Sequence, residues 1–142
     1  MFCAVALLYG VLDRKSSPLD PVLRSLVTVR VSQINWCHFC VDINSATLAK
    51  RAGSMDKVEQ LADWREKDIF TDKERLALEY AEAVTYSDQQ VSDELMQRLK
   101  VVFDDDTIVE LTGLIAFQNL SSKFNSALDV PAQGFCARPE RQ

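Results

Sequence analysis

Two cysteines and the chain's only histidine lie within one short stretch, Cys37-His38-Phe39-Cys40. Cysteines three apart on a helix lie on one face. Their Cα atoms are then about 5 Å apart, which a disulfide accepts. Asn35 is a good candidate for the N-cap of a helix that starts here, and the unpaired N–H groups and dipole of such a start stabilise a thiolate. The pair is therefore predicted to support two-electron thiol chemistry, in which one thiolate attacks and the other resolves.

The cysteine face of this predicted helix extends to Asn44. Positions 37, 40, 41 and 44 stack at helical spacing, so Asn44 is expected to point back toward the pair. His38 lies about 100° around the helix axis from Cys37. His38 is therefore not required to be the base for either sulfur, although a frayed first turn would bring it close.

Other roles for the pair are less favoured. A structural zinc site needs four ligands, and the sequence offers only Cys3, Cys136 and His38 as further soft ligands, with no second C-x-x-C. Two buried cysteines that merely pack as small apolar groups are an alternative. A thioredoxin fold is disfavoured because the βαβ pattern that it requires is absent. Redox chemistry on a helical scaffold is the preferred interpretation, and no metal or cofactor is expected.

Length, charge and the N-terminal run limit the class of protein. The 142 residues predict a single domain, 1–142. A net charge of −5 argues against nucleic acid as a partner, because phosphate binding needs a basic surface. The apolar run 2–12 has no preceding Lys or Arg and is too short to span a bilayer. It predicts a buried or subunit-contacting helix, no membrane partner, and a cytoplasmic protein with reduced cysteines.

The elements that must position the pair are predicted to be helices. Four glycines and four prolines are few for a turn-rich β-sandwich. Apolar periodicity predicts helices over 2–12, 21–34, 37–52, 54–64, 71–84, 93–102 and 107–128. The predicted caps are Asp20, Ser54, Thr71 with Glu74, Ser92 and, at a C-terminus, Gly53. The fold class is thus all-α, with about six or seven helices.

A family resemblance rests on three stretches. The first, LDPVLRSLVTVRVSQINWCHFCVDINSATLAKRAG, resembles the carboxymuconolactone decarboxylase/AhpD-like family, whose helical core carries S-Q-x-N-x-C-x-x-C-x-x-x-H. The later helices of that family are similar to TDKERLALEYAEAVT and VVFDDDTIVELTGLIAFQNLSSKFNSALDVPAQGF. The resemblance covers roughly residues 4–135. The C-x-x-C alone is a weak signal, but together with the long VELTGLIAFQN helix it is a strong one.

The resemblance implies an AhpD-like helical fold that assembles into trimers or hexamers. Peroxidase members of the family reduce alkyl hydroperoxides. By the resemblance, Cys40 attacks the peroxide oxygen and Cys37 resolves the sulfenic acid as a disulfide. A dithiol protein or small dithiol then reduces the pair again. Decarboxylase members generally lack the cysteine pair, so decarboxylation is the less expected activity.

Two positions depart from the peroxidase pattern that the resemblance supplies. Asn44 stands in place of a His, and Ser25 in place of a Glu, and that His and Glu form a proton relay that deprotonates the cysteine. General base catalysis contributes about 10²–10⁴-fold, so peroxidase turnover should be weakened, and disulfide exchange less so. We expect a thiol oxidoreductase of antioxidant defence that acts on a hydroperoxide or disulfide. The alternatives are a redox-responsive or structural oligomer without turnover, and a decarboxylase-type enzyme.

Residues outside the pair are predicted to have structural roles. Trp36 is expected to pack between helices, and Asp42 to be a solvated helix residue. Asn119 and Asn125 are expected to make interhelical or intersubunit hydrogen bonds. The tail through residue 142 is predicted to be polar and loose. The remaining cysteines, expected to be non-catalytic, are Cys3 and Cys136.

Overall fold

Seven α-helices and one 3₁₀ helix make up residues 1–136, the part of the chain that the computed structural model describes. They are α1 (Phe2–Leu12), α2 (Pro21–Ile34), α3 (His38–Ala52), α4 (Asp56–Gln60), the 3₁₀ helix η1 (Leu61–Glu66), α5 (Asp72–Thr85), α6 (Asp93–Val102) and α7 (Asp105–Ala127). The all-α prediction is confirmed, with no strand in residues 1–136. The last part of the predicted domain and tail, residues 137–142, lies outside the described residues.

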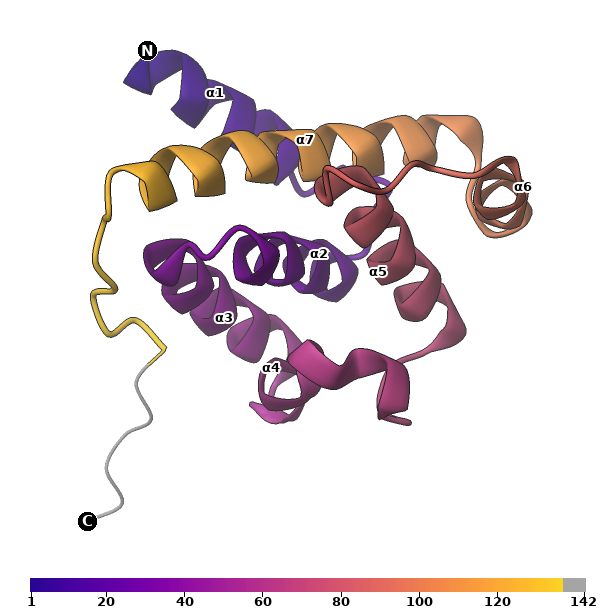
Figure 1. Ribbon diagram of the computed structural model, residues 1–142, viewed down its shortest axis with the longest axis horizontal. Helices are drawn as coiled ribbons and strands as arrows, with labels where there is room; N and C mark the ends of the chain where they lie inside the picture. The colour runs from indigo at the N-terminus through magenta and orange to yellow at the C-terminus, as the bar shows by residue number, and fades with distance from the viewer. Residues whose placement is uncertain (137–142) are drawn as a thin grey trace.

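The central element is α2, which contacts α3, α5 and α7 (Figure 1). Leu23, Val27 and Val31 join a buried cluster with residues of α5, α6 and α7. Leu26 and Val29 join a second cluster with α3, η1 and α5. Burying such a side chain contributes about 1.5–3 kcal/mol, against a helix-propensity cost of up to about 0.7 kcal/mol. Packing on both sides therefore explains why this β-branched segment is helical.

Local sequence signals set most helix ends. Asp20 accepts two backbone N–H groups in the first turn of α2, and Pro21 is the first helical residue. Thr71 and Glu74 form the predicted capping box of α5. Gly53 ends α3 with a φ of 74°, a left-handed conformation that glycine adopts without strain. Each cap satisfies backbone groups that a helix end leaves open.

The prediction of one helix over 54–64 is wrong, because α4 gives way to the 3₁₀ helix η1 at Leu61. The N-cap of α4 is Met55, one residue after the predicted Ser54. Asp63 interrupts η1 with non-helical dihedral angles, a φ of −110° and a ψ of 30°. Leu61 and Trp64, on either side of this kink, are both buried in one cluster.

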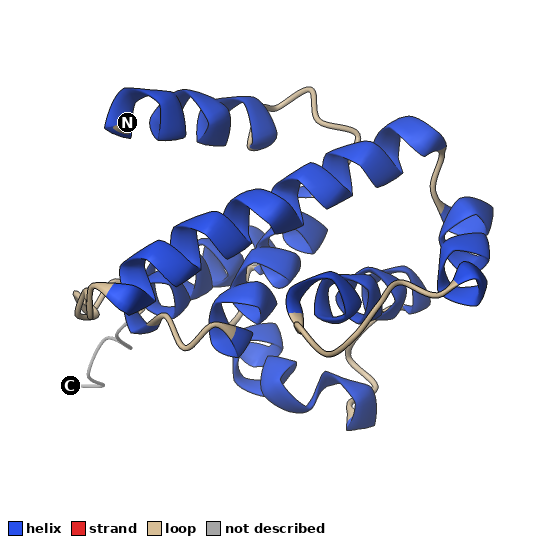
Figure 2. Ribbon diagram, turned by 45° about the horizontal axis from the view of Figure 1, so that its top comes forward, coloured by secondary structure: helices blue, strands red, loops and turns tan. Residues whose placement is uncertain are grey.

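The N-terminal helix α1 packs against α7 and keeps most of its apolar surface exposed (Figure 2). Leu12 at its end is buried, but Leu7 is 71% exposed. On α7, Val109 and Leu120 are also exposed. The run 2–12 was expected to be a buried or a subunit-contacting helix. Burial within the chain is found only at its last residue, Leu12.

Candidate active site

The N-cap of α3 is Cys37 and not Asn35. Cys37 has an extended backbone, and its Sγ accepts the backbone N–H of Cys40 at 3.1 Å. Asn35 instead follows the last residue of α2, and Trp36, with a φ of 55°, forms the corner between the two helices. The predicted cap was wrong because this corner residue delays the start of α3. The prediction of a cysteine pair at a helix N-terminus is confirmed.

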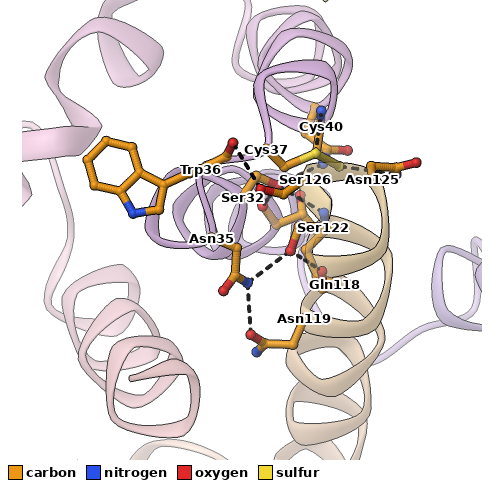
Figure 3. The surroundings of a disulfide bond; sticks show 12 residues. Ser32, Asn35, Trp36, Cys37, Cys40, Gln118, Asn119, Ser122, Asn125 and Ser126 are labelled. Carbon is orange, nitrogen blue, oxygen red and sulfur yellow. Dashed lines mark hydrogen bonds between the residues drawn. A yellow bond between two sulfur atoms is a disulfide. The ribbon is translucent and has the colours of Figure 1, made fainter. Parts of the chain in front are cut away.

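Cys37 and Cys40 form a disulfide, with a Cα–Cα distance of 5.2 Å (Figure 3). Both residues are almost fully buried, at 1% and 2% exposure. From α7, Nδ2 of Asn125 lies 3.5 Å from Sγ of Cys40 and donates a hydrogen bond to it. The interhelical bond expected of Asn125 is thus present, but its acceptor is one of the two site sulfurs, which the sequence did not indicate.

A polar network next to the disulfide fastens α2 to α7 (Figure 3). Nδ2 of Asn35 donates to Oδ1 of Asn119 at 2.8 Å and to Oγ of Ser122 at 2.9 Å. Nε2 of Gln118 donates to Oγ of Ser32 at 2.9 Å. A buried polar group left without such a partner costs about 1–3 kcal/mol. The expected interhelical role of Asn119 is confirmed, and the network holds α7 in place beside the pair.

Cys40 lines a cavity of about 480 Å³ between α1, α3 and α7, whereas Cys37 does not. No residue in its lining carries a carboxylate, ammonium, guanidinium or imidazole group. Its apolar and aromatic lining comprises Val5, Ala6, Tyr9, Phe39, Ile43 and Phe117. A small uncharged molecule in this cavity would therefore meet the sulfur of Cys40.

Ser25 and Asn44 meet at a second and much smaller cavity, of about 10 Å³. Asn44 lines both cavities, so it lies between Ser25 and the cavity of Cys40. Nδ2 of Asn44 donates to Oγ of Ser32 at 3.3 Å. The two positions of the implied relay are therefore neighbours along a path to Cys40, although the side chains there do not titrate.

Arg51 occupies the surroundings of Ser25. Its Nη1 donates to Oγ of Ser25 at 3.0 Å, and its Nη2 binds both carboxylate oxygens of Asp13, at 2.9 and 2.7 Å. Nη1 of Arg24 lies 3.6 Å from the same carboxylate. The place where the resemblance implies a base thus holds a hydroxyl bound to a cation.

Two residues that flank the pair face the solvent. His38 is exposed and lines neither cavity. Trp36 is 79% exposed, so the prediction that it packs between helices is wrong. Its left-handed corner conformation directs the indole away from the polar network and the disulfide (Figure 3).

Asp42 binds the tail and is not simply solvated, which corrects two predictions. Its carboxylate accepts the backbone N–H groups of residues 133–136 at 2.8–3.0 Å. Burial alone would raise the pKa of Asp42, but these N–H donors together outweigh it and hold the pKa below its ordinary value. The ring of Phe39 also meets that of Phe135 edge-on.

Burial, and then Asp42, raise the pKa of the Cys136 thiol, which disfavours its thiolate.

Residues 1–136 contain neither a helix that could cross a membrane nor a cluster of metal-ligating side chains. No helix there is both long and apolar enough to cross a membrane. In the same residues, no group of three or more His, Cys, Asp and Glu side chains is placed to hold a metal ion.

Fold and site together define an AhpD-like helical protein with a C-x-x-C disulfide at a helix start. The chain belongs to the carboxymuconolactone decarboxylase family, whose sequence model matches residues 4–83. It is 53% identical over 142 residues to the uncharacterized protein YnjA of Escherichia coli K12, covering 100% of this chain and 78% of YnjA. It is 30% identical over 115 residues to the uncharacterized protein YdfG of Bacillus subtilis, covering 80% of this chain and 78% of YdfG.

A solved structure supports the same assignment. It is a protein of unknown function from Agrobacterium tumefaciens, whose suggested role is that of the antioxidant defence protein AhpD. The two chains superpose with a TM-score of 0.84 at 28% sequence identity, covering 93% of this chain and 90% of the other.

Proposed function

We propose that this chain is a thiol-dependent oxidoreductase of antioxidant defence, with Cys40 as the attacking thiol and Cys37 as the resolving one. The observation that carries the proposal is the Cys37–Cys40 disulfide, of which Cys40 lines a cavity and Cys37 does not. The Sγ of Cys37 accepts the N–H of Cys40 at the helix start. A substrate in the cavity would therefore react first at Cys40, and Cys37 would complete the reaction.

Disulfide exchange would proceed in two steps. The Cys40 thiolate attacks a disulfide R–S–S–R, which gives a mixed disulfide and one thiolate RS⁻. The Cys37 thiolate then attacks the Cys40 sulfur, forms the Cys37–Cys40 bond and releases the second RS⁻. The two protons lost by the cysteines end on the two RSH products. A dithiol partner runs the same steps in reverse and is itself oxidised.

Hydroperoxide reduction would use the same pair. The Cys40 thiolate attacks the terminal oxygen of ROOH, the O–O bond breaks, and ROH and a Cys40 sulfenic acid form. Cys37 then condenses with the sulfenic acid, which releases water. The leaving alkoxide needs a proton, because the pKa of its conjugate acid resembles that of water and lies far above the pKa of about 8.5 that corresponds to a leaving thiolate. With Ser25 and Asn44 in the relay positions, disulfide exchange should be the faster activity.

The lining of the cavity favours the binding of small, uncharged and apolar substrates. Its lining offers aromatic and aliphatic side chains and no cation that would bind an anionic peptide disulfide. We expect diethyl disulfide to be a better substrate than oxidised glutathione. The dithiol that restores the pair would act in the cytoplasm, where thiols are kept reduced.

The test is a turnover assay with dithiothreitol as reductant and diethyl disulfide or cumene hydroperoxide as substrate. Cys40→Ser should abolish turnover. With diethyl disulfide and no dithiothreitol, reduced Cys37→Ser should release one equivalent of ethanethiol and keep a mixed disulfide on Cys40, visible by mass spectrometry. Cys136→Ser is the matched control and should keep full activity. Turnover that is as fast in Cys40→Ser as in the unmodified chain would reject the proposal.

The disulfide also supports an alternative, a redox-responsive protein without turnover. In that case mild peroxide would form the Cys37–Cys40 bond, but no dithiol would recycle it at a useful rate. A decarboxylase-type activity rests on family membership. Release of carbon dioxide from a γ-carboxylated lactone, unaffected by Cys40→Ser, would favour it over both redox proposals.

We also propose that the chain forms a homotrimer or homohexamer. The support is the exposed apolar surface of α1 and α7, which includes Leu7, Val109 and Leu120. Large exposed apolar patches mark contact surfaces. Sedimentation equilibrium should give a mass three or six times that of the chain, and Leu7→Glu should lower it, with Lys100→Glu on exposed α6 as the control. A monomer at micromolar concentration would reject this proposal.

A further inference from the structure

Each sulfur of the pair has its own hydrogen-bond donor. Sγ of Cys37 accepts the backbone N–H of Cys40 at 3.1 Å, a local bond within the first turn of α3. Sγ of Cys40 accepts Nδ2 of Asn125 at 3.5 Å, from α7 and 85 residues further along the chain. Figure 3 shows the Asn125 side chain beside the disulfide. The sulfur of Cys40, the cysteine that lines the cavity, thus accepts its hydrogen bond from a side chain, which substitution can change without altering the start of α3.

The position of Asn125 is fixed by bonds on both sides of it along α7. One turn before, Oγ of Ser122 accepts from Asn35 and donates to the carbonyl of Gln118. The next residue, Ser126, donates to the carbonyl of Trp36 at 3.4 Å. These bonds fasten the end of α7 to the corner that precedes Cys37. The approach of the Asn125 amide to the sulfur is therefore part of a built contact between α7 and the start of α3.

We infer that Asn125 is a catalytic residue whose amide N–H stabilises the negative charge on the sulfur of Cys40. This inference rests on the proposed function and adds to it the group that favours thiolate formation where no relay base is present. The Cys40 thiol gives its proton to solvent, and the hydrogen bond from Nδ2 shifts that equilibrium toward the thiolate. Asn125 itself gains and loses no proton, so no further reactant is needed.

The ionisable groups around Cys40 leave this role to Asn125. On α3, His38 is exposed and Asp42 binds the tail. On α7, Lys123 is exposed. From α1, Tyr9 lines the cavity, and burial is the main cause of its raised pKa, so it stays neutral. The end of α2 supplies uncharged polar side chains.

The test measures the reactivity of Cys40 alone. In a full chain carrying Cys3→Ser, Cys37→Ser and Cys136→Ser, the rate of alkylation by iodoacetamide is followed from pH 5 to 10 by mass spectrometry. Hydrogen bonds to charged groups imply that Asn125→Leu raises the midpoint of this pH profile by about one unit, a tenfold loss of thiolate at a fixed lower pH. Asn125→Asp should raise it further, because a carboxylate repels the thiolate. Gln97→Leu, which removes an exposed amide from α6, should leave the midpoint unchanged.

Several outcomes decide the matter. Because Asn125→Asp is nearly isosteric, it remains informative even if Asn125→Leu does not fold. A midpoint that stays the same in Asn125→Asp overturns the inference. So does a variant that changes only the plateau rate at high pH, because this is what a packing role would produce. The proposed function fails separately, if the unmodified chain shows no turnover with diethyl disulfide or cumene hydroperoxide while the midpoint still shifts.

Discussion

Introducing the implied proton relay would test how this site works without it. The change is Ser25→Glu with Asn44→His, at two positions that share the small cavity. In the variant, Cγ of the glutamate would take the place of Oγ of Ser25, which lies 3.0 Å from Nη1 of Arg51, and the carboxylate would extend from there within ion-pair reach of that cation. A cation at such a distance lowers a carboxyl pKa by about 1–3 units. We therefore expect the new acid to be a poor partner for the imidazole as long as Arg51 is present.

The expected sizes follow from these contacts. A working base raises the rate by about 10²–10⁴-fold. Lowering the carboxyl pKa by about 1–3 units, as Arg51 would, reduces that rate gain by a factor of about 10–10³. With a base worth about a hundredfold and a carboxyl pKa lowered by about one unit, the double variant should reduce cumene hydroperoxide about tenfold faster, whereas adding Arg51→Met should bring the gain to about a hundredfold. Ser25 is only 2% exposed. The larger side chain should therefore destabilise the fold by about 1–3 kcal/mol through overpacking.

The assay is a single turnover of the reduced protein with cumene hydroperoxide, followed as loss of thiols between pH 5 and 9. Thermal denaturation confirms that each variant is folded at the assay temperature. In the triple variant the rate should rise through a midpoint near 6.5, the ordinary pKa of histidine. Ser25→Gln with Asn44→His is the control, with the same size but no carboxylate. A full gain with Arg51 intact, or no gain in a folded triple variant, would refute the reasoning.

Three further predictions concern residues around the site and the core. Asp42→Asn should lower the hydrogen-exchange protection factors of residues 133–136, which are corrected for the intrinsic exchange rate at each pH; low pH should do the same in the unmodified chain. A carboxyl whose pKa is lowered on docking stabilises the docked tail above its ordinary pKa, and this stability is lost as the pH falls through the lowered value. Trp36→Gly should be about 1 kcal/mol more stable to urea than Trp36→Ala, because glycine adopts a φ of 55° without strain; equal stabilities would contradict this. Glu82, 4% exposed, binds two arginines and an indole N–H. Glu82→Ala should cost about 3 kcal/mol in urea denaturation, whereas Glu79→Ala, at an exposed ion pair, should cost less than about 1 kcal/mol.

Helix ends could be predicted where the signal lies within one turn of sequence. The capping box at Thr71 and Glu74 needs only two side chains and the backbone between them. Gly53 ends α3 because it alone of the nearby residues adopts a positive φ without strain. The helical state of α2, by contrast, depends on burial on two sides. Its β-branched run by itself would also suit a strand, and packing on two sides favours the helix.

The errors arise where distant partners decide. Asp42 reads as an ordinary surface residue, but its partners lie 91–94 residues further along the chain. Asn35 has the side chain of a good cap, yet it bonds to α7 and leaves the cap to Cys37. Trp36 is large and aromatic, which favours burial in general, but its corner position turns it outward. For Asp42 and Asn35 a sound local preference lost to a tertiary contact, whereas for Trp36 the conformation of the corner decided.

In the candidate site, too, some residues could be identified from local sequence and others depend on tertiary contacts. The cysteine pair could be found because its chemistry is contained in four adjacent residues. The role of Asn125 could not, since the bond to Cys40 joins two helices. A polar residue on a largely apolar helix was the only signal available, and it indicates a buried partner without identifying it. The position of Asn44 between the two cavities likewise depends on how α1, α2 and α3 meet.

The surroundings of Ser25 are built to hold a helix in place and not to move a proton. Arg51 joins the end of α3 to Asp13, which directly follows α1, and Arg24 of α2 adds a second cation near the same carboxylate. A carboxylate at position 25 would compete with Asp13 for these cations. Since α1 forms one wall of the cavity at Cys40, this ion pair keeps that wall close to the sulfur. The charges beside Ser25 therefore shape the cavity, and the chemistry is left to the hydrogen-bond donors that reach the two sulfurs directly.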